Sequence, residues 1–140
     1  MANGWISGEQ HTIPSLLERR LDSDPDGAYR DVCGTPFTAA EVYDRSCRIA
    51  PGLAALRVQP GERVASLLEN SPEAVLAWWG AVLGGYVSVP VNTAYKGRYL
   101  RHQLHDSGAS VLVVQASLAD RAAAVVDDLP DLRHVIVVED

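Results

Sequence analysis

The stretch RVASLLENSPEAVLAWWGAVLGGYVSVPVN, residues 63–92, contains a complete strand, helix and strand. Residues 63–68 are almost all apolar, as expected for a strand that is covered on both faces. Ser71 is a good N-cap and the proline after it suits the first helical position, so we predict a helix over 72–83. The two glycines that follow end this helix and precede a valine-rich strand over 86–91. The stretch therefore predicts one strand–helix–strand unit of a parallel α/β sheet, and a short crossover of this kind is almost always right-handed.

Residues 74–91 contain no charged side chain, and their length also fits a membrane-spanning helix. The glycine pair and Pro90 argue against this reading, because a continuous span has no reason to change to the period-two pattern of a strand midway. We therefore favour a buried helix followed by a strand. The small residues of this helix are expected to let the sheet approach closely; they are Ala77, Gly80, Ala81 and Gly84.

The rest of the chain continues the alternation of strands and helices. The further elements that we expect are, in chain order, a helix over 13–21 capped by Thr12, a strand over 28–32, a helix opened by Thr38 and Glu41 and interrupted near Ala50, a helix over 96–107, a strand over 110–114, a helix over 117–129 and a strand over 134–138. The interruption follows from Pro51, since an interior proline costs a helix about 3 kcal/mol. In the first helix, Leu16, Leu17 and Leu21 are expected on the inner side. This order predicts an α/β fold with a doubly wound, mostly parallel sheet and flanking helices over residues 12–140, preceded by a flexible N-terminus over 1–11.

Composition bounds the class of protein. A chain of 140 residues has the size of one domain, and its net charge of −6 with a single lysine, Lys96, leaves no basic stripe for nucleic acid. Cys33 and Cys47 belong to no CxxC pair, and polar residues interrupt any signal-like apolar run at the start of the chain. We therefore expect a cytoplasmic protein without a transmembrane segment and with reduced thiols, while a disulfide between the two cysteines stays open.

Ligands of a doubly wound sheet bind beyond the carboxyl ends of its strands, here residues 69–71, 92–95 and 115–117. None of these segments contains a phosphate-binding GxxxxGK[ST] motif, a dinucleotide-binding GxGxxG motif or the GxSxG motif of hydrolases. Strand-end position alone makes Asn92, Thr93 and Tyr95 candidates for a substrate-side or interface loop, with a turn and helix cap as the alternative. His102 and His105 could hold a metal, but without a third ligand a solvated helix face is favoured. The residues alone indicate part of an α/β enzyme or ligand-binding domain.

Several segments also carry a family resemblance. Phe37-Thr38 with Glu41-Val42, the segment LGGYVSVPVN at 83–92, and the SGA triplet before the valine-rich strand at 110–114 resemble the N-terminal region of the adenylate-forming enzymes. This superfamily comprises acyl-CoA synthetases, peptide-synthetase adenylation domains and luciferases. The resemblance runs from about residue 12 to the end, and VNTAYKGRYLRHQL at 91–104 is more similar to acyl-CoA ligases than to amino-acid adenylation domains.

The resemblance implies the N-terminal part of the large domain of an acyl-CoA synthetase. Such a ligase uses ATP, Mg²⁺ and coenzyme A: a carboxylic, here fatty, acid attacks the α-phosphate of ATP, and the thiol of coenzyme A then displaces AMP from the acyl-adenylate. In the family, the phosphate loop, the ribose-binding aspartate and the catalytic lysine lie beyond the segment that resembles this chain. No catalytic residue is therefore assigned, and the 140-residue chain is expected to be inactive and to bind none of the cofactors tightly.

The last predicted strand, 134–138, is followed only by Glu139 and Asp140, so no helix covers its far face. A self-sufficient sheet normally protects such an edge. We therefore expect the remainder of its own large domain as a partner, or self-association through the exposed edge. The alternative from another class is a stand-alone α/β ligand-binding or interaction module without ligase activity.

Overall fold

The computed structural model describes residues 12–32 and 34–139, so the predicted N-terminal segment and Cys33 lie outside the described residues. The elements are α1 (Ile13–Ser23), β1 (Ala28–Val32), β2 (Thr35–Thr38), α2 (Ala39–Cys47), α3 (Ile49–Ala55), β3 (Arg63–Leu67), α4 (Pro72–Leu83), β4 (Val87–Pro90), α5 (Arg98–Ser107), β5 (Val111–Gln115), the 3₁₀ turn η1 (Ala116–Leu118), α6 (Ala119–Ala123), the 3₁₀ turn η2 (Val126–Asp128) and β6 (His134–Val138). Among these residues, no helix has the length and apolarity needed to cross a bilayer.

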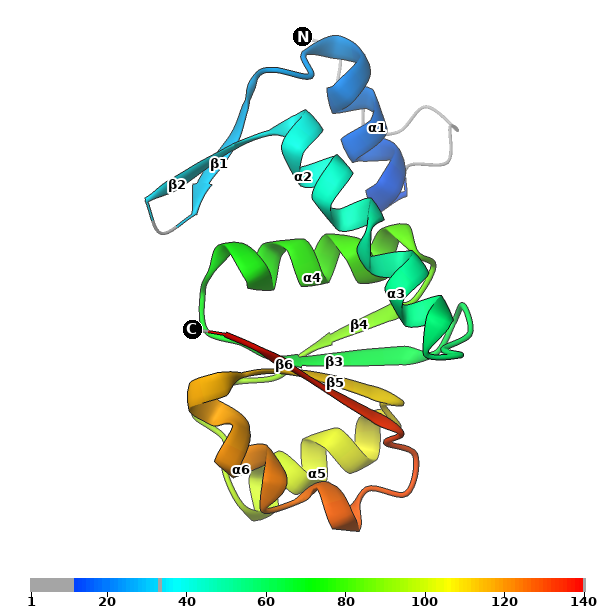
Figure 1. The fold of residues 1–140 in the computed structure, drawn as a ribbon, viewed down its shortest axis with the longest axis vertical. Helices are drawn as coiled ribbons and strands as arrows, with labels where there is room; N and C mark the ends of the chain where they lie inside the picture. The colour runs from blue at the N-terminus through cyan, green and yellow to red at the C-terminus, as the bar shows by residue number, and fades with distance from the viewer. Residues whose placement is uncertain (1–11, 33, 140) are drawn as a thin grey trace, which may run out of the picture.

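The predicted doubly wound sheet is confirmed. Strands β3 to β6 form a four-stranded, wholly parallel sheet in the order β4-β3-β5-β6, while β1 and β2 form a separate antiparallel hairpin. Figure 1 shows the sheet between α4 with α3 on one face and α5 with α6 on the other, while α1 and α2 lie on the side of α4 that faces away from the sheet. Because the chain leaves β3 for one side and β5 for the other, the winding reverses between these two central strands.

The two central strands carry the core on both faces, as their apolar sequences predicted. Toward α5 and α6, Leu67 and Leu112 are fully buried and pack with Leu100 and Leu104 of α5. Toward α3 and α4, Val64 and Val111 join a second cluster that includes Leu53 and Ala81; these residues are also buried. A strand that is covered on both faces has a continuous apolar sequence, which is why these strands were recognisable.

After Glu73 in its first turn, helix α4 is apolar all round because it is covered from two sides. Its inner side faces the sheet, and on its outer side Trp79 packs with Leu17, Phe37 and Val42 in a third apolar cluster. Trp78 and Trp79 meet edge to face, with ring centroids 4.8 Å apart. The helix therefore attaches the N-terminal elements α1, β2 and α2 to the body of the sheet.

The expectation that all the small residues of α4 admit the sheet is wrong for Gly80. A Cβ at Gly80 would lie 2.6 Å from the Cβ of Ile49, and one at Gly84 would lie 2.9 Å from the Cβ of Ala50. Gly80 thus admits helix α3, whereas at Gly84 the atoms nearest to such a Cβ belong to the ring of Tyr86, at 2.5 and 2.8 Å, directly before β4. Ala81 does face the sheet, since it is buried in the cluster that contains Val64.

The segment between residues 38 and 55 confirms both the capping box and the interruption. The Thr38 N–H donates to Glu41 Oε2 at 2.9 Å, and the Glu41 N–H donates to Thr38 Oγ1 at 3.1 Å, which caps α2. Helix α2 ends at Cys47, and α3 begins after Arg48. Pro51 consequently lies in the first turn of α3, where the proline's missing N–H has no intrahelical acceptor to lose.

Two predictions about helices are corrected. The predicted helix over 117–129 is divided into η1, α6 and η2; Val125, at φ −131°, leaves the helical conformation and is buried in the core with Leu129. In α1, Leu17 is 2% exposed but Leu16 is 44% exposed, because only one of two adjacent helical positions can face α4. In both places tertiary packing decides what local propensity left undecided.

An ion pair ties the turn before β3 to the loop before β6. Glu62 Oε2 accepts the N–H of Gln59 at 2.6 Å, and both Glu62 oxygens accept from Arg133 Nη2 at 2.6 Å. The pKa of Glu62 lies below its ordinary value of 4.5. The hydrogen bond from the Gln59 N–H is the largest cause, and the hydrogen bond from the Arg133 guanidinium is the next. The lowered pKa means that the folded state favours ionised Glu62 more than the unfolded state does.

This pair predicts a pH dependence of stability. The contribution of ionised Glu62 to the stability of the fold is fully present above its unfolded-state pKa near 4.5. This contribution is lost as the pH falls through the lower pKa of Glu62 in the folded state. Glu62→Gln should therefore be less stable than the parent near neutral pH, and the difference should shrink below pH 4.5. Urea unfolding of both proteins as a function of pH measures this, with Arg133→Gln as the partner-side control. A difference that stays constant with pH would show that the carboxylate charge is not responsible.

Candidate ligand-binding loops at the sheet edge

The three segments at the carboxyl ends of β3, β4 and β5 lie at one edge of the parallel sheet, and we call them the switch-point loops: residues 69–71, 92–95 and 115–117, of which the last begins with the final residue of β5. Since the winding reverses between β3 and β5, the crevice expected of doubly wound sheets lies between the first and third loops. The structure therefore confirms the topology on which the sequence-based choice of these loops depended.

Gln115 joins the first and third loops. Its side-chain Oε1 accepts the backbone N–H of Glu69 at 3.0 Å, across the point where the winding reverses. Both strand ends are thereby held together by one amide. The amide hydrogens of the Gln115 side chain and the carboxylate of Glu69 are polar groups that this edge could offer to a ligand.

The second loop forms a tight turn. Asn92 Oδ1 accepts the N–H of Ala94 at 2.9 Å, and the Asn92 carbonyl accepts the N–H of Tyr95 at 3.0 Å. The Thr93 carbonyl accepts from Arg121 Nη1 of α6 at 2.7 Å. Asn92 thus has the turn role that was weighed as the alternative, and Thr93 is attached to α6 through its backbone.

Tyr95 extends the second loop onto the exposed side of α5. Its side chain is exposed, and its ring centroid lies 6.3 Å from the ring centroid of Tyr99. The guanidinium of Arg98 lies over the Tyr99 ring, 4.9 Å from the centroid of that ring. The three predicted residues Asn92, Thr93 and Tyr95 are therefore brought to one loop, but no partner group identifies what they would bind. Their role at a substrate or interface remains a prediction.

The switch-point loops do not fit the phosphates of Mg-ATP on their own. Glu69 is their only charged side chain, and a carboxylate repels phosphate. Phosphoryl transfer requires cations and backbone amides around the developing charge. Among residues 12–32 and 34–139, no three His, Cys, Asp or Glu side chains gather into a metal-binding group.

The two histidines of α5 lie on its exposed face. His102 and His105 line an open hollow of about 410 Å³ together with Arg101 and Asp128. Arg101 Nη1 contacts Asp128 Oδ2 at 3.3 Å, and both side chains are more than half exposed. The hollow is a solvated surface with an ion pair, so the face of α5 that carries the histidines lies in water.

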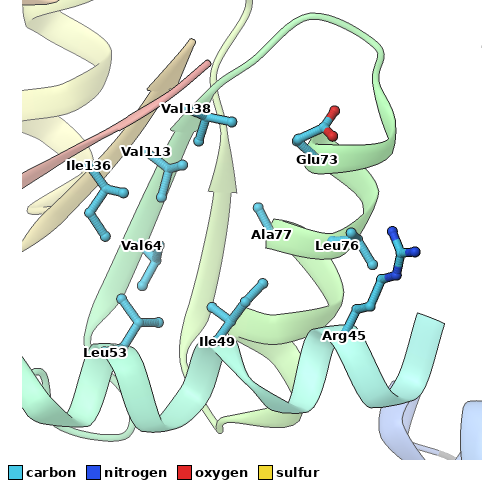
Figure 2. A pocket seen from close by; sticks show the side chains of 10 residues that line it. All are labelled: Arg45, Ile49, Leu53, Val64, Glu73, Leu76, Ala77, Val113, Ile136 and Val138. Carbon is cyan, nitrogen blue, oxygen red and sulfur yellow. The ribbon is translucent and has the colours of Figure 1, made fainter. Parts of the chain in front are cut away.

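An apolar groove on the opposite face of the sheet was not predicted. This β6 groove has a volume of about 310 Å³ and lies between α3, α4 and the strands β5 and β6 (Figure 2). Its lining residues are Arg45, Ile49, Leu53, Val64, Glu73, Leu76, Ala77, Val113, Ile136 and Val138. Figure 2 shows the two charged residues at the end away from Ile136, so the floor along β6 is entirely aliphatic.

The fold defines a doubly wound α/β domain with a mostly parallel sheet. The chain belongs to the AMP-binding enzyme family, whose sequence model matches residues 17–140. This membership confirms the resemblance to adenylate-forming enzymes.

The relatives include two kinds of adenylate-forming enzyme. The medium/long-chain-fatty-acid–CoA/3-oxocholest-4-en-26-oate–CoA ligase of Mycobacterium tuberculosis is 35% identical over 129 residues, which cover 91% of this chain and 23% of the ligase. A linear gramicidin synthase of Brevibacillus parabrevis is 34% identical over 119 residues, 83% of this chain and 2% of the synthase. An anthranilate CoA ligase, solved in complex with anthranoyl-AMP, matches at a TM-score of 0.83 with 27% identity, over 89% of this chain and 24% of that one.

These matches cover only a small part of the relatives. The chain spans less than a quarter of the length of the fatty-acid ligase and of the anthranilate ligase. The activity of those whole enzymes therefore does not pass directly to this chain.

Proposed function

We propose that the chain, over residues 12–140, forms the N-terminal part of the large domain of an ATP-dependent acyl-CoA ligase. The parent enzyme would activate a carboxylic, most simply a fatty, acid as an acyl-adenylate and transfer it to coenzyme A. The observation that carries this proposal is the match of nearly the whole chain to the AMP-binding family, together with its structural likeness to a CoA ligase that holds an acyl-adenylate.

Two features favour an acyl-CoA ligase over a peptide synthetase as the parent. The fatty-acid ligase of M. tuberculosis aligns with 91% of this chain against 83% for the gramicidin synthase, at nearly equal identity. The segment 91–104, which contains the second switch-point loop and most of α5, also resembles acyl-CoA ligases more closely. Neither observation concerns an acid-binding pocket, so they support the reaction class and leave the acid open.

The role proposed for this chain is positioning. The sheet holds the switch-point loops at the edge where ligands of doubly wound folds bind, and Asn92, Thr93 and Tyr95 would face the substrate side or the remainder of the large domain. ATP, Mg²⁺ and coenzyme A belong to the parent, because the loops of this chain carry no cation for the phosphates. The partners proposed are accordingly the carboxylic acid, the two cofactors and the rest of the large domain.

We predict that the 140-residue chain releases no pyrophosphate from Mg-ATP in the presence of carboxylic acids of different lengths. The physical reason is the missing neutralisation of the transferring phosphoryl group, which electrostatic groups of an intact site would supply. The measurement is a coupled pyrophosphate assay, with the M. tuberculosis ligase as the active control. Release that rises with chain concentration and requires the acid would overturn the prediction.

A stand-alone α/β binding module is the second candidate. It is favoured by the three buried apolar clusters, which give the described residues a core of their own. The intact mass of the native gene product in its own cells separates the two proposals. A mass several times 15.1 kDa would support the ligase, whereas a mass of 15.1 kDa would remove ligase chemistry and favour the module.

A further inference from the structure

Strand β6 is an edge strand that exposes apolar side chains on both faces. Val135 and Val137 are 45% and 55% exposed on the face that carries α5 and α6. On the other face, Ile136 and Val138 line the β6 groove. One side of the β6 backbone pairs with β5, and along the described chain no strand pairs with the other side. Such an edge is a template for pairing with another strand.

The opposite edge of the sheet is protected in a way that β6 is not. Strand β4 is shorter, with four residues, and it contains Pro90, which has no N–H to offer to an incoming strand. Strand β6 has five residues, HVIVV, without proline or glycine. If one edge of this sheet recruits a partner strand, the physical chemistry favours β6.

The sequence around β6 is complementary to itself in one antiparallel register. In RHVIVVE, residues 133–139, a two-fold axis through Ile136 places Arg133 opposite Glu139 at both ends and Val135 opposite Val137. An axis through Val137 would instead place Val135 opposite Glu139. Only the register centred on Ile136 pairs the opposite charges.

We propose that β6 pairs with β6 of a second copy of this chain, antiparallel and with the two-fold axis at Ile136, which joins the two sheets into one. Because the same patch serves both copies, the contact closes as a dimer and does not extend into a filament. Arg133 already contacts Glu62, but its guanidinium has five N–H donors and can also bind the partner's Glu139. This proposal concerns the 140-residue chain itself and does not depend on the proposed ligase reaction.

Light scattering after size exclusion tests the dimer. We expect the chain to elute with twice its mass of 15.1 kDa, and Val137→Lys to weaken dimerisation at least about tenfold, because it places a lysine opposite an apolar side chain near the axis. Val87→Lys is the matched control, since Val87 is an exposed edge-strand valine (48%) on β4, and it should leave the dimer intact. Circular dichroism of both variants verifies that they are folded.

Cysteine cross-linking tests the register. Ile136→Cys should form a disulfide with its own copy, because residues directly opposite in an antiparallel pair have Cα atoms about 4.5–5.5 Å apart, within the range of a disulfide. A mixture of Val135→Cys and Val137→Cys should give the mixed dimer in preference to either homodimer, with the parent chain as the blank for Cys33 and Cys47. A monomer at all concentrations up to roughly 100 µM, open-ended aggregates, or cross-links in another register would overturn the proposal. A monomer would leave the edge to the remainder of the large domain.

Discussion

Replacing Leu112 by alanine is expected to lower the free energy of unfolding by about 2–5 kcal/mol, the range typical of a large-to-small change in a packed core. Leu112 is completely buried in the central strand β5. It packs in the cluster that contains Leu67, Leu100 and Leu104, so side chains from several elements would line the cavity left by the lost methyl groups. Chemical denaturation followed by circular dichroism measures the loss, and the m-value should stay unchanged if the fold is kept.

Leu16→Ala is the control for this prediction. Leu16 is 44% exposed on α1, so the same chemical change removes much less buried surface and should cost less than about 1 kcal/mol. The comparison holds the substitution constant while burial differs; the change from a strand to a helix adds a propensity difference of only about 1 kcal/mol or less. Equal losses at both positions would contradict the assignment of Leu112 to the core. Because domains of this size are stable by only about 5–15 kcal/mol, a loss at the upper end would leave little folded protein under mild denaturing conditions.

The sequence was informative wherever one local signal decided the structure. The apolar runs of β3 and β5 predicted strands covered on both faces, Thr38 with Glu41 predicted the start of α2, and Pro51 predicted the interruption that separates α2 from α3. Each of these signals acts within a few residues. Tertiary packing therefore had little opportunity to override them.

Predictions failed where the decision was tertiary. Periodicity could not tell Leu16 from Leu17 as the residue that faces α4, and helix propensity could not show that Val125 would leave the helix to enter the core. The partner of Gly80 was also misassigned, since spacing marks a small-residue surface but not which element approaches it.

The candidate site was predictable only in its position. Strand order places the switch-point loops at one edge, and the carboxyl-end rule selects that edge without any side-chain information. The hydrogen bond between Gln115 and Glu69 joins residues 46 positions apart, so no local pattern could indicate it. The β6 groove was hidden for the same reason, because its lining combines helices that precede β4 with the strand that ends the sheet.

Gly80→Leu is expected to destabilise the protein by about 3 kcal/mol or more. Gly80 is buried in α4, and even a Cβ there would lie 2.6 Å from the Cβ and Cδ1 of Ile49. A leucine must therefore force α3 away from α4, and overpacking of this kind typically costs about 1–3 kcal/mol, with more for a larger added volume. Helix propensity opposes the loss by only about 1 kcal/mol, since leucine is a better helix former than glycine. Thermal and chemical unfolding both measure the result.

Gly52→Leu separates the gain in helix propensity from the cost of steric overlap. Gly52 lies in α3, and a Cβ there would have no heavy atom within 4 Å, so the change keeps the propensity gain without the overlap. It should leave stability unchanged or raise it by up to about 1 kcal/mol. Opposite signs for the same substitution in two adjoining helices would establish that Gly80 is required by the approach of α3. A tolerated leucine at position 80 would show that α3 can shift away from α4, and the walls of the β6 groove formed by Ile49 and Leu53 would then have to be adjustable too.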